Sequence, residues 1–258
     1  ALVKLGWLPK VKTNVEKIQA LLNFFGVAGI NEWKAIWEEA GAAYRKSPSF
    51  KSKPAAVAAW LRKGEIEALD IQCKPYKASA FRAALKKIRA LTMEPAEIFE
   101  PEMRRLCAEA GVATVFVPEL PGTHVYGATR WLRPMKALIY LSLRGKSDDH
   151  LWFTFFHEAG HILFHEKHDV FIEAKGEGCG ATAGTGKEQE ANQFAQDFLI
   201  PPKEYQPFLQ TDQFSEAGIK RFAKQLGIAP GIVVGRLQHD KVIPYSAANS
   251  LKKRFRFR

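Results

Sequence analysis

The chain of 258 residues has the composition of a folded globular protein. Hydrophobic residues make up 47% and charged residues 25% of it, which is typical of globular domains, and no apolar run approaches the roughly 18–20 residues that span a bilayer. Disordered and membrane-embedded classes are therefore excluded. The net charge of +11 gathers in the first 90 residues and in the tail from Lys252 to Arg258. This pattern suits either an acidic partner such as nucleic acid or a solvated basic surface.

The cysteines and the N-terminal residues indicate a cytoplasmic protein without a membrane partner. Cys73, Cys107 and Cys179 are odd in number and widely spaced, matching neither a disulfide framework nor a CxxC zinc knuckle. We therefore expect reduced thiols. The start of the chain has no signal-peptide features. It also lacks an initiating methionine, which favours a chain that begins inside a longer protein.

Residues 1–100 are predicted to form a helical N-terminal region. The first helix should end at Gly26 and bury one apolar stripe, which consists of Val15, Ile18, Leu21, Leu22 and Phe25. Apolar residues recur at helical spacing over four segments, Asn14–Phe25, Asn31–Tyr44, Pro54 to about Lys63, and Ala78–Leu91.

A small sheet is predicted after Pro95 and Pro101, which mark the end of the helical N-terminal region. A short helix over Glu102–Ala110 precedes three β-branched or apolar runs, Ala113–Leu120, Gly127–Leu132 and Ala137–Leu143. We expect a mixed or antiparallel sheet packed on the apolar helix that follows, with Ser147 as the N-cap of that helix. The run Ala137–Leu143 is the expected sheet edge, along which an extended substrate would pair.

The apolar helix carries the sequence HEAGH at residues 157–161, an HExxH pattern. Positions i and i+4 share one helix face, so the imidazoles of His157 and His161 can reach one zinc ion. Glu158 lies at the edge of that face, where its carboxylate can take a proton from the attacking water without binding the metal. Burying these groups in so apolar a helix would be unfavourable unless they had a function, and Gly160 is expected to leave room beside the metal.

A third protein ligand is expected from the acidic helix KEQEANQFAQDFLIPP, about Lys187–Leu199. Glu188 is preferred because Asn192, four residues on, can hydrogen-bond a ligand imidazole, and Glu190 stays open as the alternative. His165 lies too far along the helix to close the same tetrahedron, so we expect it to face solvent or substrate. His150 is a weaker candidate, as is His168. Tyr126, Arg130, His168 and Tyr205 are equal candidates for stabilising the oxyanion.

The C-terminal part contains helix-turn-helix spacing over residues 215–237, after a glycine-rich segment at 174–186 and the acidic helix. The second helix of that pair, APGIVVGRL, is almost wholly apolar, which favours packing against the rest of the chain over reading DNA bases. The tail LKKRFRFR is expected to be solvated. The chain is thus predicted to be α+β and mainly helical, with a helical region 1–100, a metallopeptidase domain 101–213 and a C-terminal helical region 214–258.

The segments WFTFFHEAGHILFH and KEQEANQFAQDFLIPP closely resemble the ImmA/IrrE family of metallopeptidases. VFVPELPGTHVYGATRWL and FAKQLGIAPGIVVGRLQ also match the family's order of elements, from about Ala110 to Gln238. The resemblance implies a minimal zincin-like fold in which His157, His161 and Glu188 bind zinc and Glu158 is the general base. Both motifs are intact, which implies an active enzyme.

The resemblance also implies a biological role. Members of the family cut, or are thought to cut, helix-turn-helix repressors. Many of them are classed with antitoxins and carry a DNA-binding helix-turn-helix domain ahead of the peptidase. This chain would lack that domain. We therefore expect a zinc endopeptidase that cleaves a repressor or antitoxin-type regulator. The alternative is a regulator whose zincin fold mainly binds a partner protein. One Zn²⁺ ion is expected, and the ligand types leave Mn²⁺ and Fe²⁺ open.

Overall fold

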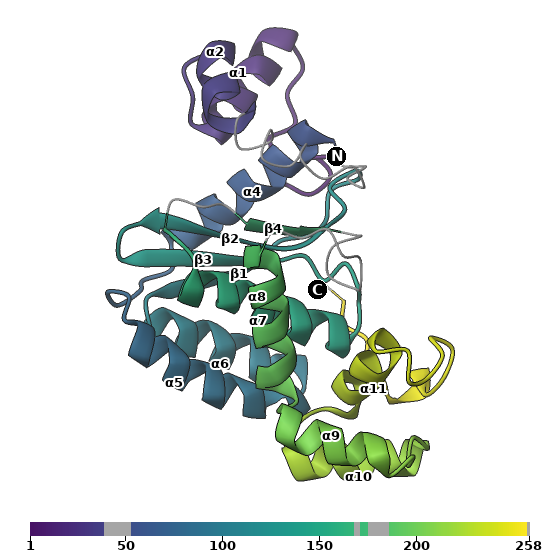
Figure 1. Cartoon of the computed structure of the whole chain (residues 1–258). Helices are drawn as coiled ribbons and strands as arrows, with labels where there is room; N and C mark the ends of the chain where they lie inside the picture. Colours follow the sequence, from purple (N-terminus) through teal and green to yellow (C-terminus); the bar gives the residue numbers. More distant parts are fainter. Residues whose placement is uncertain (39–52, 168–170, 175–185, 257–258) are drawn as a thin grey trace.

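The computed structural model describes residues 1–38, 53–167, 171–174 and 186–256, and its centre is a four-stranded mixed sheet in the order β1-β3-β2-β4 (Figure 1). Strand β3 pairs in parallel with β1 and antiparallel with β2, which in turn pairs antiparallel with β4. The strands span Val112–Phe116 (β1), Val125–Arg133 (β2), Lys136–Leu141 (β3) and Phe171–Ala174 (β4).

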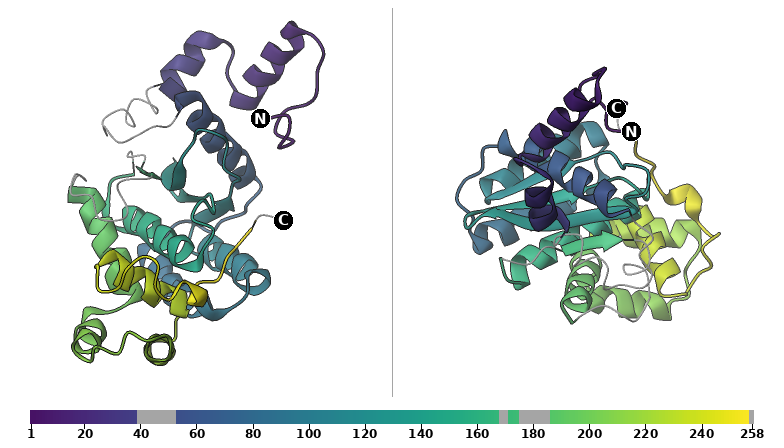
Figure 2. Two further views of the ribbon diagram at one scale, coloured as in Figure 1. Left: turned by 90° about the vertical axis from the view of Figure 1, so that its right-hand side faces the viewer. Right: turned by 90° about the horizontal axis from the view of Figure 1, so that it is seen from above.

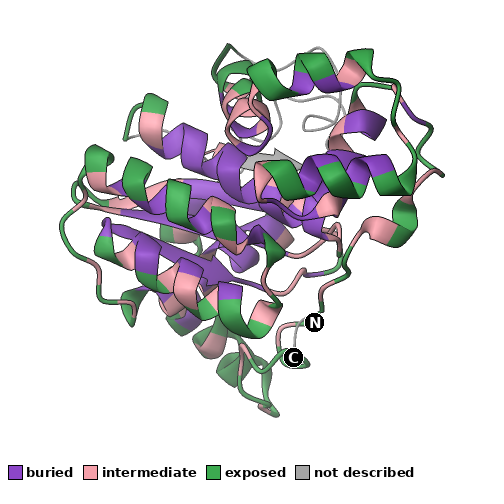
Figure 3. Ribbon diagram, turned by 90° about the horizontal axis from the view of Figure 1, so that it is seen from below, coloured by how far each residue is buried: buried purple, intermediate pink, exposed green. Residues whose placement is uncertain are grey.

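Helices cover both faces of this sheet and make a three-layer core, as Figure 3 shows by the concentration of buried residues at its centre. One face packs on α5 (Ala78–Ala90), α6 (Ala96–Glu109) and α7 (Asp148–Phe164). The other face packs on α4 (Pro54–Leu69). Successive residues of β1 and β3 enter opposite clusters, as the alternation of side chains along a strand requires. The predicted α+β class is confirmed.

The predicted edge strand is wrong. Strand β3 lies between β1 and β2, and all of its residues after Lys136 are buried. A continuous apolar run of this kind is typical of a strand covered on both faces. One edge of the sheet is instead β4, a four-residue strand that we did not predict. A strand this short has too few residues to display an alternating pattern.

Two helix boundaries also differ from prediction. Helix α6 starts at Ala96 and includes Pro101 in its second turn, so the predicted start at Glu102 is wrong. A proline near the helix start removes a single hydrogen bond to the carbonyl four residues back. Helix α4 continues past Lys63, and Gly64 allows it to lie directly on the sheet, because a Cβ there would be 2.3 Å from the Tyr140 ring.

The N-terminal helices α1 (Asn14–Phe25) and α2 (Ile30–Trp33) lie beyond the outer end of α4, away from α7 (Figures 1 and 2). Helix α1 has the predicted bounds and ends at Gly26, whose φ is 68°. The predicted buried stripe is correct only at its C-terminal end: Phe25 is buried, but Val15 is 77% exposed and Ile18 58%. Phe24, which the stripe did not include, is also buried. A π-helical turn, Lys34–Glu38, follows α2, and the rest of the helix predicted to Tyr44 lies outside the described residues.

Four helices form the C-terminal part, α8 (Gly186–Leu199), α9 (Pro202–Gln210), α10 (Glu216–Leu226) and α11 (Pro230–His239). Two of them, α8 and α11, pack on α7, in keeping with the prediction that the apolar second helix packs against the rest of the chain. Helix α11 buries Ile232, Val233 and Val234. It approaches α7 so closely that a Cβ at Gly231 would lie 2.2 Å from Oδ1 of Asp148. Short 3₁₀ turns occur at Leu91–Met93 and Asn249–Leu251. No helix among the described residues combines the length and apolar character needed to cross a bilayer.

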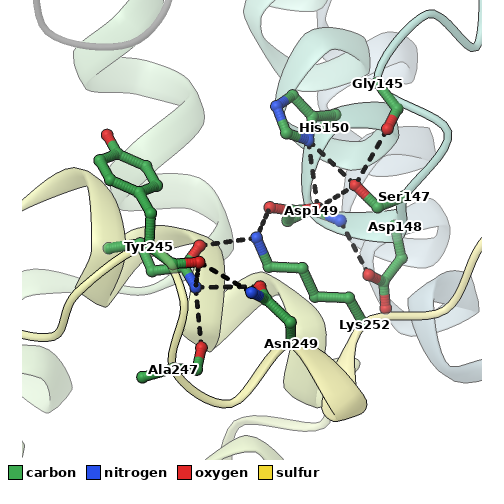
Figure 4. Close-up of polar contacts among 10 residues, drawn as sticks. Gly145, Ser147, Asp148, Asp149, His150, Tyr245, Ala247, Asn249 and Lys252 are labelled. Carbon is green, nitrogen blue, oxygen red and sulfur yellow. Dashed lines mark hydrogen bonds and ion pairs between the residues drawn. The ribbon is translucent and has the colours of Figure 1, made fainter.

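The C-terminal tail exposes Lys253, Arg254 and Arg256, as predicted, but it also binds the fold, which the sequence did not predict. Its backbone pairs with the residues at the start of α7: the Asp148 amide donates to Lys253 O at 2.9 Å, and the Phe255 amide donates to Lys146 O at 2.8 Å. Nζ of Lys252 lies 2.6 Å from Oδ2 of Asp149 (Figure 4). Because Asp149 is buried, its carboxylate needs a cationic partner, and Lys252 of the basic tail supplies it.

Candidate metal centre

Helix α7 places two histidines one turn apart at the middle of the molecule. His157 and His161 are only 1% and 2% exposed. Their Nε2 atoms lie 3.0 Å apart and their rings meet edge to face at a centroid distance of 4.7 Å. Both imidazoles therefore direct the same nitrogen towards one shared point, as the i, i+4 spacing predicts.

Helix α8 brings Glu188 to the same point. Its carboxylate oxygens lie 3.3 Å from Nε2 of His157 and 3.5 Å from Nε2 of His161. Gly160 makes this approach possible, since a Cβ there would lie 3.2 Å from Cα of Ala191 on α8. The room that Gly160 was expected to leave beside a metal is thus taken by the neighbouring helix.

The ionisation of these groups suits metal binding. Burial is the largest influence on His161 and lowers its pKa to about 4, so the imidazole is neutral at neutral pH and carries a lone pair. Burial alone would raise the pKa of Glu188, but hydrogen bonds with His157 and His161 outweigh it and hold that pKa well below its usual range. Neutral imidazole and carboxylate are the forms that bind a metal.

Three further contacts surround the histidine pair. Oδ1 of Asn192 lies 2.9 Å from Nδ1 of His157, so this amide reaches a ligand imidazole in the way the sequence predicts. Nδ1 of His165 lies 2.9 Å from Nδ1 of His161, and Nε2 of His165 lies 3.1 Å from a Glu190 oxygen. Glu190 therefore contacts His165, while Glu188 supplies the carboxylate that meets the histidine pair.

His165 is not the solvent-facing histidine that we predicted. Its side chain is only 3% exposed. Helix α7 ends at Phe164, and the extended backbone of His165 turns its ring back onto His161. The axial distance along a straight helix therefore does not apply to His165, whose Nδ1 lies 2.9 Å from Nδ1 of His161.

Glu158 lies between α7 and strand β2 and is fully buried. A Cβ at Gly127 of β2 would lie 2.9 Å from Oε1 of Glu158, so a glycine is needed at this position to leave room for the carboxylate. The Thr129 hydroxyl donates to the main-chain oxygen of Glu158 at 3.2 Å. Strand β2 thus holds this turn of α7, and the side chain of Glu158 is shielded from bulk water.

The other candidates for oxyanion stabilisation lie elsewhere or cannot be placed. Arg130 is ion-paired with Glu65 of α4, on the opposite face of the sheet from α7. Tyr205 donates its hydroxyl to Asp240 at 2.9 Å and is buried in the C-terminal region. The polar groups of both candidates are thus engaged by other elements, Arg130 by Glu65 and Tyr205 by Asp240. His168 lies outside the described residues.

Tyr126 and His150 lie together near the start of α7. Their rings stack at a centroid distance of 5.9 Å, and both line a small cavity with Thr154. His150 is two helical turns before Glu158, about 12 Å along the axis. His150 therefore belongs to the other end of the helix from the histidine pair.

Two features of the centre are not indicated by the sequence. The Phe171 ring of β4 stacks on the His161 imidazole at a centroid distance of 3.9 Å. Gly127 of β2, which makes room for Glu158, was predicted only as a strand residue. Neither residue has a chemical signature in the sequence. Phe171 acts through the shape of its ring, and Gly127 acts through the absence of a side chain.

His157, His161 and Glu188 fit a tetrahedrally bound divalent cation. Their ligand atoms all lie within 4.8 Å of one another. Bonds of about 2.0–2.1 Å in a tetrahedron place ligand atoms about 3.3–3.4 Å apart, and the observed separations are 3.0, 3.3 and 3.5 Å. Two imidazoles and one carboxylate also leave a fourth position open, as catalytic zinc sites require.

Comparison with known proteins gives one match that covers this centre. The family model described as Peptidase_M78, IrrE N-terminal-like domain, matches residues 107–238. That range is just over half of the chain and includes α7, α8 and the whole sheet. No curated protein matches the chain.

Proposed function

The chain belongs to the Peptidase_M78 family of metallopeptidases, the IrrE N-terminal-like domain family, and on that premise we propose that it is a zinc-dependent endopeptidase acting on a protein substrate. One observation carries the proposal. Two imidazoles and a carboxylate, those of His157, His161 and Glu188, converge on one point inside the protein. Zinc suits this set of nitrogen and oxygen ligands, and Mn²⁺ or Fe²⁺ are the competing occupants.

Glu158 is the proposed general base. A zinc ion bound here would act as a Lewis acid on the carbonyl of the scissile bond. The Glu158 carboxylate would take a proton from the attacking water and deliver it to the departing amine nitrogen. The burial of Glu158 between α7 and β2 supports this role, because a fixed, water-excluded carboxylate loses little energy to reorganisation during the reaction.

Strand β4 is the proposed docking edge for an extended substrate, in place of β3. Among the described strands β4 pairs only with β2, so its second edge has no strand partner. Its Phe171 ring contacts His161, which brings this edge next to the centre. An extended peptide added to such an edge gains main-chain hydrogen bonds irrespective of its sequence.

The substrate is proposed to be a helix-turn-helix repressor or an antitoxin-type regulator. The resemblance to the ImmA/IrrE family supports this class. A protein substrate also fits a centre that lies beside a sheet edge. A regulator that binds its partner with little turnover is the competing function.

The test combines metal analysis with one conservative substitution. The purified chain is expected to hold about one zinc per chain and to cleave a repressor or antitoxin encoded beside it. Glu158→Gln keeps the ligands and removes only the base, so cleavage should fall by about 10²–10⁴ while zinc content stays the same. Biological activity that survives Glu158→Gln would favour the partner-binding regulator and contradict the peptidase.

A further inference from the structure

His165 forms the middle of a hydrogen-bonded chain that leads from the metal centre to the protein surface. Its ring lies between His161, on the side of the centre, and Glu190, whose side chain is 56% exposed. The ring itself is almost fully buried. A buried imidazole with a partner on each nitrogen has a defined orientation and a defined proton position.

The exposed end of the chain decides which nitrogen carries each proton. A carboxylate only accepts hydrogen bonds, so Nε2 of His165 must donate to Glu190 at 3.1 Å. In a neutral imidazole the other nitrogen, Nδ1, then accepts. Nδ1 of His161, 2.9 Å away, must be the donor, which leaves Nε2 of His161 with its lone pair directed at His157 and Glu188.

The opposite proton arrangement is incompatible with metal binding. If Nδ1 of His165 donated to His161, then Nε2 of His161 would carry the proton, only 3.0 Å from Nε2 of His157. Nε2 of His165 would then place a lone pair against the Glu190 carboxylate. A proton on Nε2 of His161 would leave no lone pair there for a cation, and the lone pair of the neutral His165 ring would repel the Glu190 carboxylate. Glu190 therefore selects the tautomer of His161 that can bind a cation.

Helix α8 contributes three side chains to this network from alternate positions. Glu188 joins the centre, Glu190 anchors His165, and Asn192 contacts Nδ1 of His157. The two ligand histidines are therefore held differently, His157 by an amide directly and His161 through a second imidazole.

From this geometry we infer that His165 and Glu190 are positioning residues of the zinc site. They hold His161 in the tautomer and orientation that bind metal, and neither is a ligand. The inference rests on the proposed zinc site at His157, His161 and Glu188. Partners of this kind on a ligand histidine typically contribute 10- to 100-fold to metal affinity.

The experiment measures the Kd of the full chain for Zn²⁺ by competition with a chromophoric chelator. His165→Phe keeps an aromatic ring but has no acceptor, and it should weaken Zn²⁺ binding by about 10- to 100-fold. His165→Asn loses the ring but has an amide oxygen close to the place of Nδ1, so it should recover most of the affinity. If His165 merely filled space, the order would be reversed, with Phe tolerated and Asn impaired.

Two further variants keep the inference testable if His165→Phe does not fold. Glu190→Ala changes only an exposed side chain and should weaken Zn²⁺ binding in the same direction, whereas Gln193→Ala, an exposed neighbour on α8, should not. The visible spectrum of the Co²⁺-loaded protein should shift in Glu190→Ala and not in Gln193→Ala. Unchanged Kd in both His165→Phe and Glu190→Ala would overturn the inference. A wild-type chain that binds no Zn²⁺ would instead overturn the proposed function.

Discussion

The two ends of helix α7 bury charged or metal-binding groups in different ways. At its start, Asp148 and Asp149 are buried, and Lys252 of the tail supplies a cation 2.6 Å from the Asp149 carboxylate (Figure 4). At its other end, His157, His161 and Glu188 converge. There Glu188 pairs with both histidines, at 3.3 Å from His157 and 3.5 Å from His161.

This difference separates a structural cluster from a functional one. A buried carboxylate requires a counter-ion. At the start of α7 the chain provides it, and Nζ of Lys252 is also held by Oε1 of Gln238 at 2.7 Å. At the histidine end a bound metal cation would supply the positive charge. The same rule of charge compensation therefore predicts a fold-stabilising contact in one place and a metal site in the other.

The largest expected effect is the loss of metal binding when a ligand is removed. Glu188→Ala deletes the one anionic ligand, so Zn²⁺ affinity should fall by more than the ~100-fold typical of outer contacts. In wild type, Zn²⁺ at about 100 times Kd should stabilise the fold by about 2.7 kcal/mol, and Glu188→Ala should lose most of that gain. Thermal unfolding with and without Zn²⁺ measures this, with Gln193→Ala as the control on the same helix. An equal zinc-dependent gain in Glu188→Ala would remove Glu188 from the site.

A smaller but still large effect is expected at the other end of the helix. Lys252→Met leaves Asp149 buried without its cation and should destabilise the fold by about 3 kcal/mol. Chemical denaturation measures the loss, and Asp149→Asn combined with Lys252→Met should recover part of it. Zn²⁺ affinity should stay the same, because the histidine end has its own contacts. A parallel loss of Zn²⁺ affinity would show that the two ends are not independent.

The smallest effect concerns the pH dependence of stability at Asp148. Burial, and then the neighbouring Asp149, raise the pKa of Asp148 to about 6, above the value of about 3.9 in an unfolded chain. The folded state therefore holds this proton more tightly, and the resulting stabilisation is lost as pH rises from about 4 through 6. Asp148→Asn should match wild type near pH 4 and exceed it by about 2 kcal/mol above pH 7. A difference that does not change with pH would contradict a raised pKa.

The sequence by itself determined the elements with strong periodic or chemical signals. Helix α1 has its predicted bounds, β1 to β3 lie within a few residues of their predicted runs, and HEAGH lies on a helix. The preference for Glu188 over Glu190 also agrees with the geometry, because Glu188 and Asn192 are one helical turn apart and both face the histidines. These features depend on local spacing, which the order of residues specifies directly.

Only the tertiary structure decided which strand lies at the edge, where the basic tail binds and what His165 contacts. Strand β4 is too short for a pattern, and its partner β2 ends well before it in the chain. The tail contacts the start of α7, about a hundred residues earlier in the chain. Lys252 forms an ion pair only because the fold places it beside the buried Asp149. His165 turns onto His161 because α7 ends there. Each of these contacts joins residues through packing, and the sequence holds no local signal for packing between distant segments.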